Sequence, residues 1–143
     1  VKAELLRAVD DDSRAFDALM AASRLPKATH DEQARRETAI QEATLRAIEV
    51  PLSVIRACDG ALPLVERVAR DGNKNSISDA GVAALCLRTA AHGAYLNVMI
   101  NMSGLSDKHA GERLAKEAHS LFKQVDAAVT KIVEGVEKSI VAG

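Results

Sequence analysis

The chain has 143 residues, a length that indicates one domain with a single hydrophobic core. Hydrophobic residues make up 48% of it and aromatic residues only 2%, a profile typical of closely packed helices rather than of a β-sandwich or barrel. The net charge of -1, with both signs interspersed, argues against a nucleic-acid-binding surface. The scattered histidines and cysteines have no spacing typical of a metal site, so we expect neither a metal nor a nucleic acid as a ligand.

The cysteines and the most apolar stretch of the sequence indicate the cellular compartment and whether the chain crosses a membrane. Cys58 and Cys86 lie within apolar helical patterns, which predicts small core residues in a reducing compartment. The stretch 82–105 is interrupted by an arginine, a histidine and two asparagines, which argues against a membrane span. No signal or lipidation motif opens the sequence. We therefore expect a cytoplasmic protein without membrane contact.

Apolar spacing predicts an all-α fold, and the first half of the chain predicts two helices. A helix is expected over residues 1–24, ended by Leu25-Pro26, because the residue before a proline disfavours helix. Residues 29–32 form a capping box that begins a long second helix. Pro51 should kink or interrupt this second helix.

The second half predicts two further helices. Gly72 suits the position after a helix end, and a polar loop follows over 72–79. The next helix, over 79–102, is apolar nearly all round and should be the central one. The last helix, over 108–141, has apolar residues at alternating spacings of four and three, typical of a core or a dimer face. These residues are Leu114, Ala118, Leu121, Val125, Ala128, Ile132, Val136 and Ile140.

Asp12 is the residue that helical geometry singles out for chemistry. It lies between Val9 and Phe16 on the apolar stripe of the first helix, whereas the two aspartates before it point to the polar side. A carboxylate on such a stripe loses hydration and needs a partner, or it becomes easier to protonate and usable as a general acid or base. The alternative is a structural aspartate satisfied by backbone amides or by an arginine.

A second candidate surface lies on the central helix. Asp79, Asn97 and Asn101 share one helical face with small residues between them. Small side chains leave room for a flat ligand, or they let a neighbouring helix pack closely while the asparagines bond across. Spacing leaves both explanations open. His92, on the opposite side, is interpreted as a packing or surface histidine.

Five blocks of sequence occur together in a specific order. They are Asp10-Asp11-Asp12 followed by Ala15-Phe16, Leu25-Pro26-Lys27, Val50-Pro51-Leu52, the stretch from Gly72-Asn73 through Ser78-Asp79 to Ala83, and Gly93-Ala94-x-x-Asn97-Val98-x-Ile100-Asn101. In combination they closely resemble the cyclodeaminase domain of the formiminotransferase-cyclodeaminase family, which includes stand-alone methenyltetrahydrofolate cyclohydrolases. The resemblance covers essentially the whole chain.

The resemblance implies a fold and an activity. The fold would be a homodimeric bundle of long kinked helices, with tetrahydrofolate derivatives bound near the subunit interface. The enzyme would be a lyase that eliminates ammonia from 5-formimino-tetrahydrofolate or a hydrolase that opens 5,10-methenyl-tetrahydrofolate, with Asp12 as its catalytic aspartate. No cofactor beyond the tetrahydrofolate substrate is implied. Family members begin with a glycine-rich turn and small-residue helices, so residues 1–143 are expected to form a single cyclodeaminase-like domain without that N-terminal part.

The candidate substrate-binding residues are Lys27, Asn73, Asp79, Asn97 and Asn101. Lys27 would neutralise the glutamate tail of the folate, with a solvated lysine as the alternative, and the asparagines would hydrogen-bond the pterin or its one-carbon unit. We expect the loop 72–79 to approach Asn97 and Asn101, so that these residues and Asp12 border one cavity. The alternative function is a non-catalytic folate-binding or helical dimerisation module that has lost the glycine-rich segment.

Overall fold

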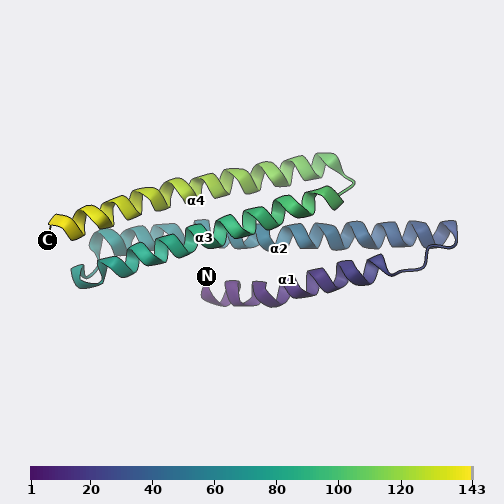
Figure 1. Cartoon of the computed structure of the whole chain (residues 1–143), viewed down its shortest axis with the longest axis horizontal. Helices are drawn as coiled ribbons and strands as arrows, with labels where there is room; N and C mark the ends of the chain where they lie inside the picture. Colours follow the sequence, from purple (N-terminus) through teal and green to yellow (C-terminus); the bar gives the residue numbers. More distant parts are fainter. Residues whose placement is uncertain (143) are drawn as a thin grey trace.

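The computed structural model describes residues 1–142, which form helices and short connections without a strand (Figure 1). The helices are α1 (Lys2–Ser23), α2 (His30–Asp71), α3 (Ile77–Asn101) and α4 (Lys108–Ala142), with single 3-10 turns η1 (Lys74–Ser76) and η2 (Met102–Gly104) on either side of α3. The expected all-α class is therefore confirmed. None of these helices is long and apolar enough to cross a membrane.

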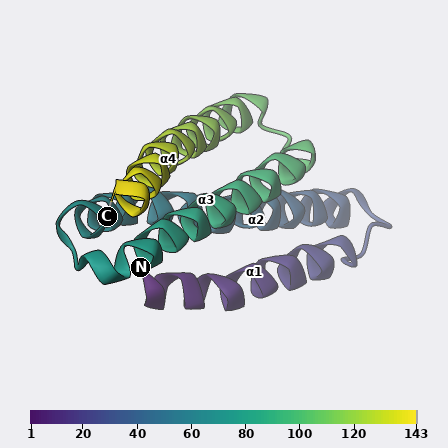
Figure 2. The same cartoon turned by 60° about the vertical axis from the view of Figure 1, so that its left-hand side comes forward.

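α2 is the longest helix and the one that contacts all three others (Figures 1 and 2). α1 lies along it from about Arg36 to Gly60, and α3 and α4 pack along it as an antiparallel pair. The expected central position of the helix over 79–102 is therefore wrong. Although α3 is apolar nearly all round, only one of its faces enters the core. On another face Val82, Leu96 and Ile100 remain exposed.

The ends of the first two helices follow from local sequence. α1 ends at Ser23, shortly before Pro26, as expected. The capping box of α2 is present: Glu32 N donates to Thr29 Oγ1 (3.2 Å) and Thr29 N donates to the Glu32 carboxylate (3.0 Å). α2 then continues through Pro51 as one helix, so of the two outcomes expected there, a kink or an interruption, the interruption does not occur.

The core lies between α2, α3 and α4. Its fully buried side chains include Ile48, Leu52, Ile55, Cys58, Val98, Val125 and Val129. Burial raises the pKa of the Cys58 thiol, whereas Cys86 is exposed on α3, so only one cysteine is the core residue expected from the pattern. The apolar seam of α4 packs largely within the chain: its members at 118, 125, 132 and 136 are buried, those at 114, 121 and 128 are half-buried, and Ile140 is exposed.

Small residues on α3 allow the three core helices to approach closely. Ala84 and Ala91 have no exposed surface, and a Cβ atom at Gly81 would lie 3.2 Å from Val136 Cγ1 on α4. One charged contact joins the same two helices: Arg88 Nε lies 3.0 Å from Asp126 Oδ1. The packing of α3 against α4 is therefore set by side-chain size at its centre and by charge at its edge.

We expect Gly81→Leu to lower the free energy of unfolding by about 1–3 kcal/mol, because the new side chain overpacks the contact with Val136. Gly135→Leu on α4 is the matched control, since a Cβ atom there meets nothing within 4 Å. It should keep or slightly raise stability, as leucine favours helix more than glycine does. Denaturant titration followed by circular dichroism compares the two, and equal stabilities would contradict the packing.

Candidate functional site

A groove of about 260 Å³ lies where α1, α2 and α3 meet. Its lining residues are Leu5, Ala8, Val9 and Asp12 from α1, Val50, Pro51 and Val54 from α2, and Ala90, Ala94 and Asn97 from α3. Asp12 and Asn97 are the polar members of an otherwise apolar lining. The fold thus brings together two of the six candidate residues from helices that are far apart in the sequence.

The placement of Asp12 differs from the expectation in one respect. α1 packs on α2 through Ala15 and Ala22, which are buried, with Ala8 half-buried one heptad earlier. This row of small residues lets the helices approach closely and turns the larger stripe outward, so that Val9 and Phe16 are 65% and 61% exposed. Asp12 lies between the two rows. It lines the groove, as expected, but its side chain is exposed rather than buried.

Arg14 distinguishes Asp12 from the two aspartates before it. The Arg14 guanidinium lies 2.9 Å from Asp11 Oδ1 and 3.9 Å from Asp10 Oδ2. Within residues 1–142, the Asp12 carboxylate has no ion pair or side-chain hydrogen bond. It is therefore a carboxylate beside an apolar groove that no other residue of the described chain engages.

Three of the candidate residues lie far from this groove. Lys27 is exposed in the connection after α1, beyond a stretch of helix from Asp12 to Ser23 of about 16 Å at 1.5 Å per residue. Asn73 Oδ1 accepts a hydrogen bond from Asn75 N (3.0 Å) at the start of η1. Asp79 begins α3 and lies roughly 27 Å along that helix from Asn97.

The expected shared cavity is therefore wrong for the loop 72–79. α3 runs without a break between the loop and Asn97, so it holds them at opposite ends. Asn101 does not line the groove either, because its Nδ2 atom donates to Ala47 O (2.9 Å) on α2. Of the pair of asparagines, Asn97 faces the groove and Asn101 joins two helices.

The α2 wall of the groove was not among the candidate residues. Val50 and Pro51 form it, and Ala90 and Ala94 of α3 form the facing wall. The signal was present in the sequence, since Val50-Pro51-Leu52 is one of the five blocks and the alanines belong to the small-residue face. Periodicity alone could not find this wall because it depends on how α3 lies on α2.

His92 packs as expected from the sequence. Its ring stacks on Phe122 of α4 with centroids 4.7 Å apart, and Tyr95 stacks on Phe122 at 5.2 Å. His119 Nδ1 lies 3.4 Å from the Tyr95 hydroxyl. These rings join α3 to α4, and residues 1–142 contain no group of three or more side chains able to hold a metal ion.

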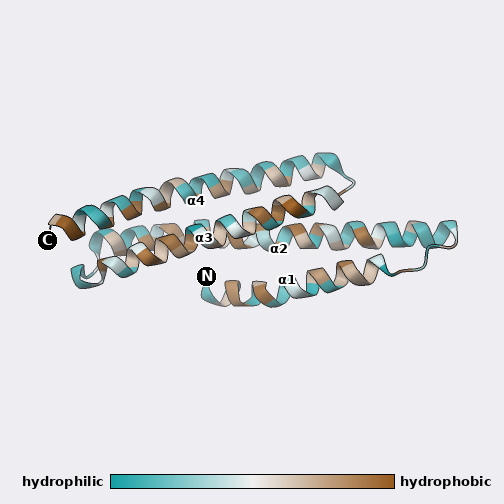
Figure 3. Cartoon of the chain, in the orientation of Figure 1, coloured by the Kyte–Doolittle hydropathy of each residue, from teal (hydrophilic) through white to brown (hydrophobic). Residues whose placement is uncertain are grey.

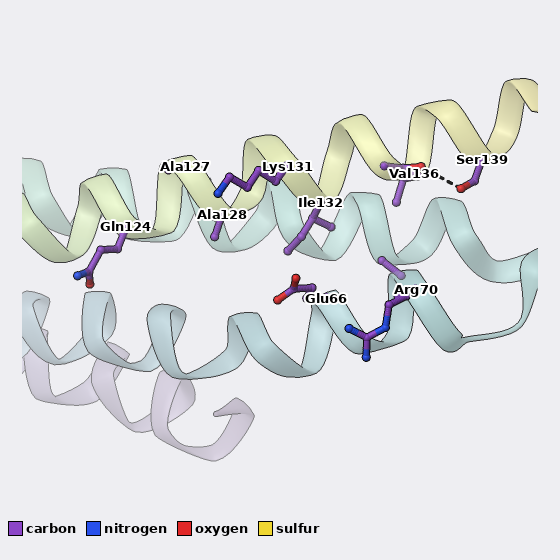
Figure 4. A pocket seen from close by; sticks show the side chains of 11 residues that line it. Glu66, Arg70, Gln124, Ala127, Ala128, Lys131, Ile132, Val136 and Ser139 are labelled. Atoms are coloured by element: carbon purple, nitrogen blue, oxygen red, sulfur yellow. Dashed lines mark hydrogen bonds between the residues drawn. The ribbon is translucent and has the colours of Figure 1, made fainter.

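Other hollows also contain carboxylates, but none of them includes Asp12 or Asn97. One of about 590 Å³ lies between α2 and α4, where Glu66 and Lys131 border a floor of small residues (Figure 4). Another, of about 750 Å³, lies at the end of the bundle and includes Asn73. Neither includes Asp12 or Asn97. A third hollow, of about 560 Å³ between α1 and α2, has Glu4 and Asp11 in its lining, but these carboxylates form ion pairs with the N-terminus and with Arg14. The groove at Asp12 is therefore the candidate active site.

Comparison with known proteins shows the family of the chain. The family model of formiminotransferase-cyclodeaminase matches residues 1–120, so the chain belongs to that family. It is 42% identical over 132 residues to the methenyltetrahydrofolate cyclohydrolase of Methylorubrum extorquens, covering 92% of this chain and 64% of that protein. It is 35% identical over 135 residues to the formimidoyltransferase-cyclodeaminase of Rattus norvegicus, covering 94% of this chain and 25% of that protein.

A solved structure has the same fold. The crystal structure of formiminotetrahydrofolate cyclodeaminase from Thermotoga maritima matches with a TM-score of 0.81 and 25% sequence identity, over 96% of this chain and 64% of that one. The resemblance inferred from the five blocks is thereby confirmed. The chain spans 64% of the length of the Methylorubrum relative and a quarter of the length of the rat relative.

Proposed function

We propose that the chain acts in folate one-carbon metabolism, on 5-formimino- or 5,10-methenyl-tetrahydrofolate, with Asp12 as the general acid or base. The observation that carries the proposal is the position of Asp12: a carboxylate without an ion pair, on an apolar groove that it shares with Asn97. The names of the relatives supply the substrate class, since they are a methenyltetrahydrofolate cyclohydrolase and formimidoyltransferase-cyclodeaminases. The two free cysteines suit a reducing compartment such as the cytoplasm.

One carboxyl group suffices for the proton transfers of either reaction. In hydrolysis, the Asp12 carboxylate takes a proton from the water that attacks the carbon between N5 and N10, and this proton passes to N5 as its bond to carbon breaks. The hydroxyl group on that carbon becomes the formyl C=O and releases its proton to solvent through the same carboxylate. In deamination, N10 attacks the carbon of the protonated formimino group and loses its proton to the Asp12 carboxylate, which then gives that proton to the nitrogen that leaves as ammonia. Neither route needs a metal or a cofactor beyond the folate. Asn97 would hydrogen-bond the polar edge of the bound ring.

The size of the groove limits what it holds. Its volume of about 260 Å³ lies below the range of roughly 300–1,000 Å³ that is typical of pockets for drug-sized ligands. We infer that it receives the reacting ring and that the remainder of the folate lies outside it. A second surface is then needed to cover the ring and exclude water from Asp12.

We propose that a second copy of the chain provides this cover, in a homodimer. Figure 3 shows hydrophobic positions along both α1 and α3. Large apolar side chains are exposed on both flanks of the groove. They are Val9, Phe16 and Met20 on α1 and Val82, Leu85, Leu96 and Ile100 on α3; we call this set the open face. By helical periodicity the two rows adjoin Asp12 and Asn97. Soluble monomers seldom expose such a surface, and a two-fold pairing is the commonest way to bury it.

The dimer face differs from the one expected from the sequence. Most of the seam of α4 packs inside the chain, with four of its eight residues buried and only Ile140 exposed, so it offers a partner little apolar surface. We therefore propose the open face, in place of the seam, as the dimer interface, because it adjoins the candidate active site. Covering it would desolvate Asp12, the condition under which a carboxyl group serves as an acid or base near neutral pH.

We expect Asp12→Asn to keep the fold and to lower turnover of 5,10-methenyl-tetrahydrofolate by roughly 10²–10⁴-fold, because the amide cannot carry the proton. Asp10→Asn is the matched control, since Asp10 is on the same helix but lies toward Arg14. It should retain activity within about twofold, as exposed ion pairs contribute little. Steady-state kinetics of the three proteins decide, and full activity of Asp12→Asn would exclude its role. No turnover by the unmodified chain would favour the non-catalytic module instead.

A pair of leucines tests the open face. Leu96 on α3 and Leu64 on α2 are each 56% exposed, and only Leu96 belongs to the open face. We expect Leu96→Glu to convert a dimer into a monomer, because it buries charge in the interface, whereas Leu64→Glu leaves the dimer intact. Sedimentation velocity measures both. A monomeric unmodified chain at high concentration, or equal effects of the two variants, would contradict the proposed interface.

A further inference from the structure

Pro51 removes a hydrogen bond from the interior of α2. A proline has no N–H, so the carbonyl of Ala47, four residues earlier, loses its partner within the helix. Both residues are buried, and a buried carbonyl requires another donor. Asn101 supplies it: its Nδ2 atom donates to Ala47 O at 2.9 Å. The last residue of α3 thus replaces the donor that the proline removed from α2.

Pro63, also inside α2, offers an internal comparison. Pro63 is exposed, and the carbonyl that it frees belongs to Asp59, which is half-buried. No side chain in the described part of the molecule donates to that carbonyl, and solvent reaches this side of the helix. A compensating side chain is therefore present at the buried proline and not at the exposed one, as expected if its purpose is to satisfy a carbonyl that water cannot reach.

Further contacts join α2 to the turn that follows α3. Gln41 Nε2 donates to Gly104 O (3.1 Å), and Ser106 N donates to Gln41 Oε1 (2.7 Å). Between Gln41 and Ala47 on α2, Thr44 lies so close to η2 that a Cβ atom at Gly104 would be 3.3 Å from its Cγ2. These contacts fix where along α2 the α3 helix ends.

We propose that Asn101 is a positioning residue for the candidate active site, because its bond to Ala47 fixes the register of α3 on α2. Pro51 lies one helical turn after Ala47, Asn97 lies one turn before Asn101, and both Pro51 and Asn97 line the groove. The bond therefore sets how the two walls of the groove face each other. This role differs from the direct contact with substrate expected from the sequence. Its consequence for substrate rests on the proposed function, whereas the coupling to Pro51 does not.

A double-mutant cycle on stability tests the coupling. Asn101→Ala should raise the unfolding equilibrium constant about tenfold, because it leaves the buried Ala47 carbonyl unpaired. In the Pro51→Ala background the helix regains the N–H for that carbonyl, so Asn101→Ala should cost less than about twofold. Asn101→Asp keeps the shape but removes the donor, and should behave like Asn101→Ala. Asn97→Ala, one turn earlier, is the control, and its effect on stability should not depend on Pro51.

The same cycle on kinetics separates positioning from direct contact. If Asn101 acts through the register, Asn101→Ala raises the KM for 5,10-methenyl-tetrahydrofolate in the native background and adds little in the Pro51→Ala background. An equal rise in both backgrounds would mean that Asn101 binds the substrate, and would overturn the proposal. An equal loss of stability in both backgrounds would also overturn it. A chain without turnover would contradict the proposed function, while the stability cycle would still decide the coupling.

Discussion

Three helices share the surface of α2, and the rest of the structure depends on that sharing. α2 is 42 residues long and buries Ile48, Leu52 and Ile55 completely. No single neighbour covers it: α1 packs on one side of it from about Arg36 to Gly60, while α3 and α4 pack on the others. The groove at Asp12 forms where α1 and α3 both reach α2 near Pro51 without closing on each other. The candidate active site is thus a consequence of how α2 is divided among its neighbours.

Features that depend on a few adjacent residues were predictable from the sequence. The all-α class, the end of α1 before Pro26 and the capping box at Thr29 and Glu32 each follow from local rules, and the structure has all of them. The placement of Asp12 was only partly predictable. Hydrophobic periodicity finds the stripe of Val9 and Phe16, but it gives little weight to the neighbouring row of alanines. That row packs on α2, because small side chains permit the closest approach.

Contacts between segments that are far apart in the sequence were harder to predict. The loop 72–79 and Asn97 appear as polar positions of one helix face, yet an unbroken α3 keeps them apart. Asn97 and Asn101 have the same side chain one turn apart, but only Asn101 meets a carbonyl freed by a proline in another helix. The two roles diverge through the register of α3 on α2, which no spacing within a single helix can reveal.

In the proposed dimer, the second copy covers the groove and removes water from the Asp12 carboxylate, which makes that group reactive. Arg14 pairs with Asp10 and Asp11, the groove has an apolar wall beside Asp12, and the side chains of the open face are exposed. The most direct test is the turnover of 5,10-methenyl-tetrahydrofolate per chain, measured across concentrations that span dimer dissociation, with sedimentation in parallel. The account predicts that activity per chain rises in proportion to the dimer fraction. Constant activity per chain down to concentrations at which the chain is a monomer would contradict it.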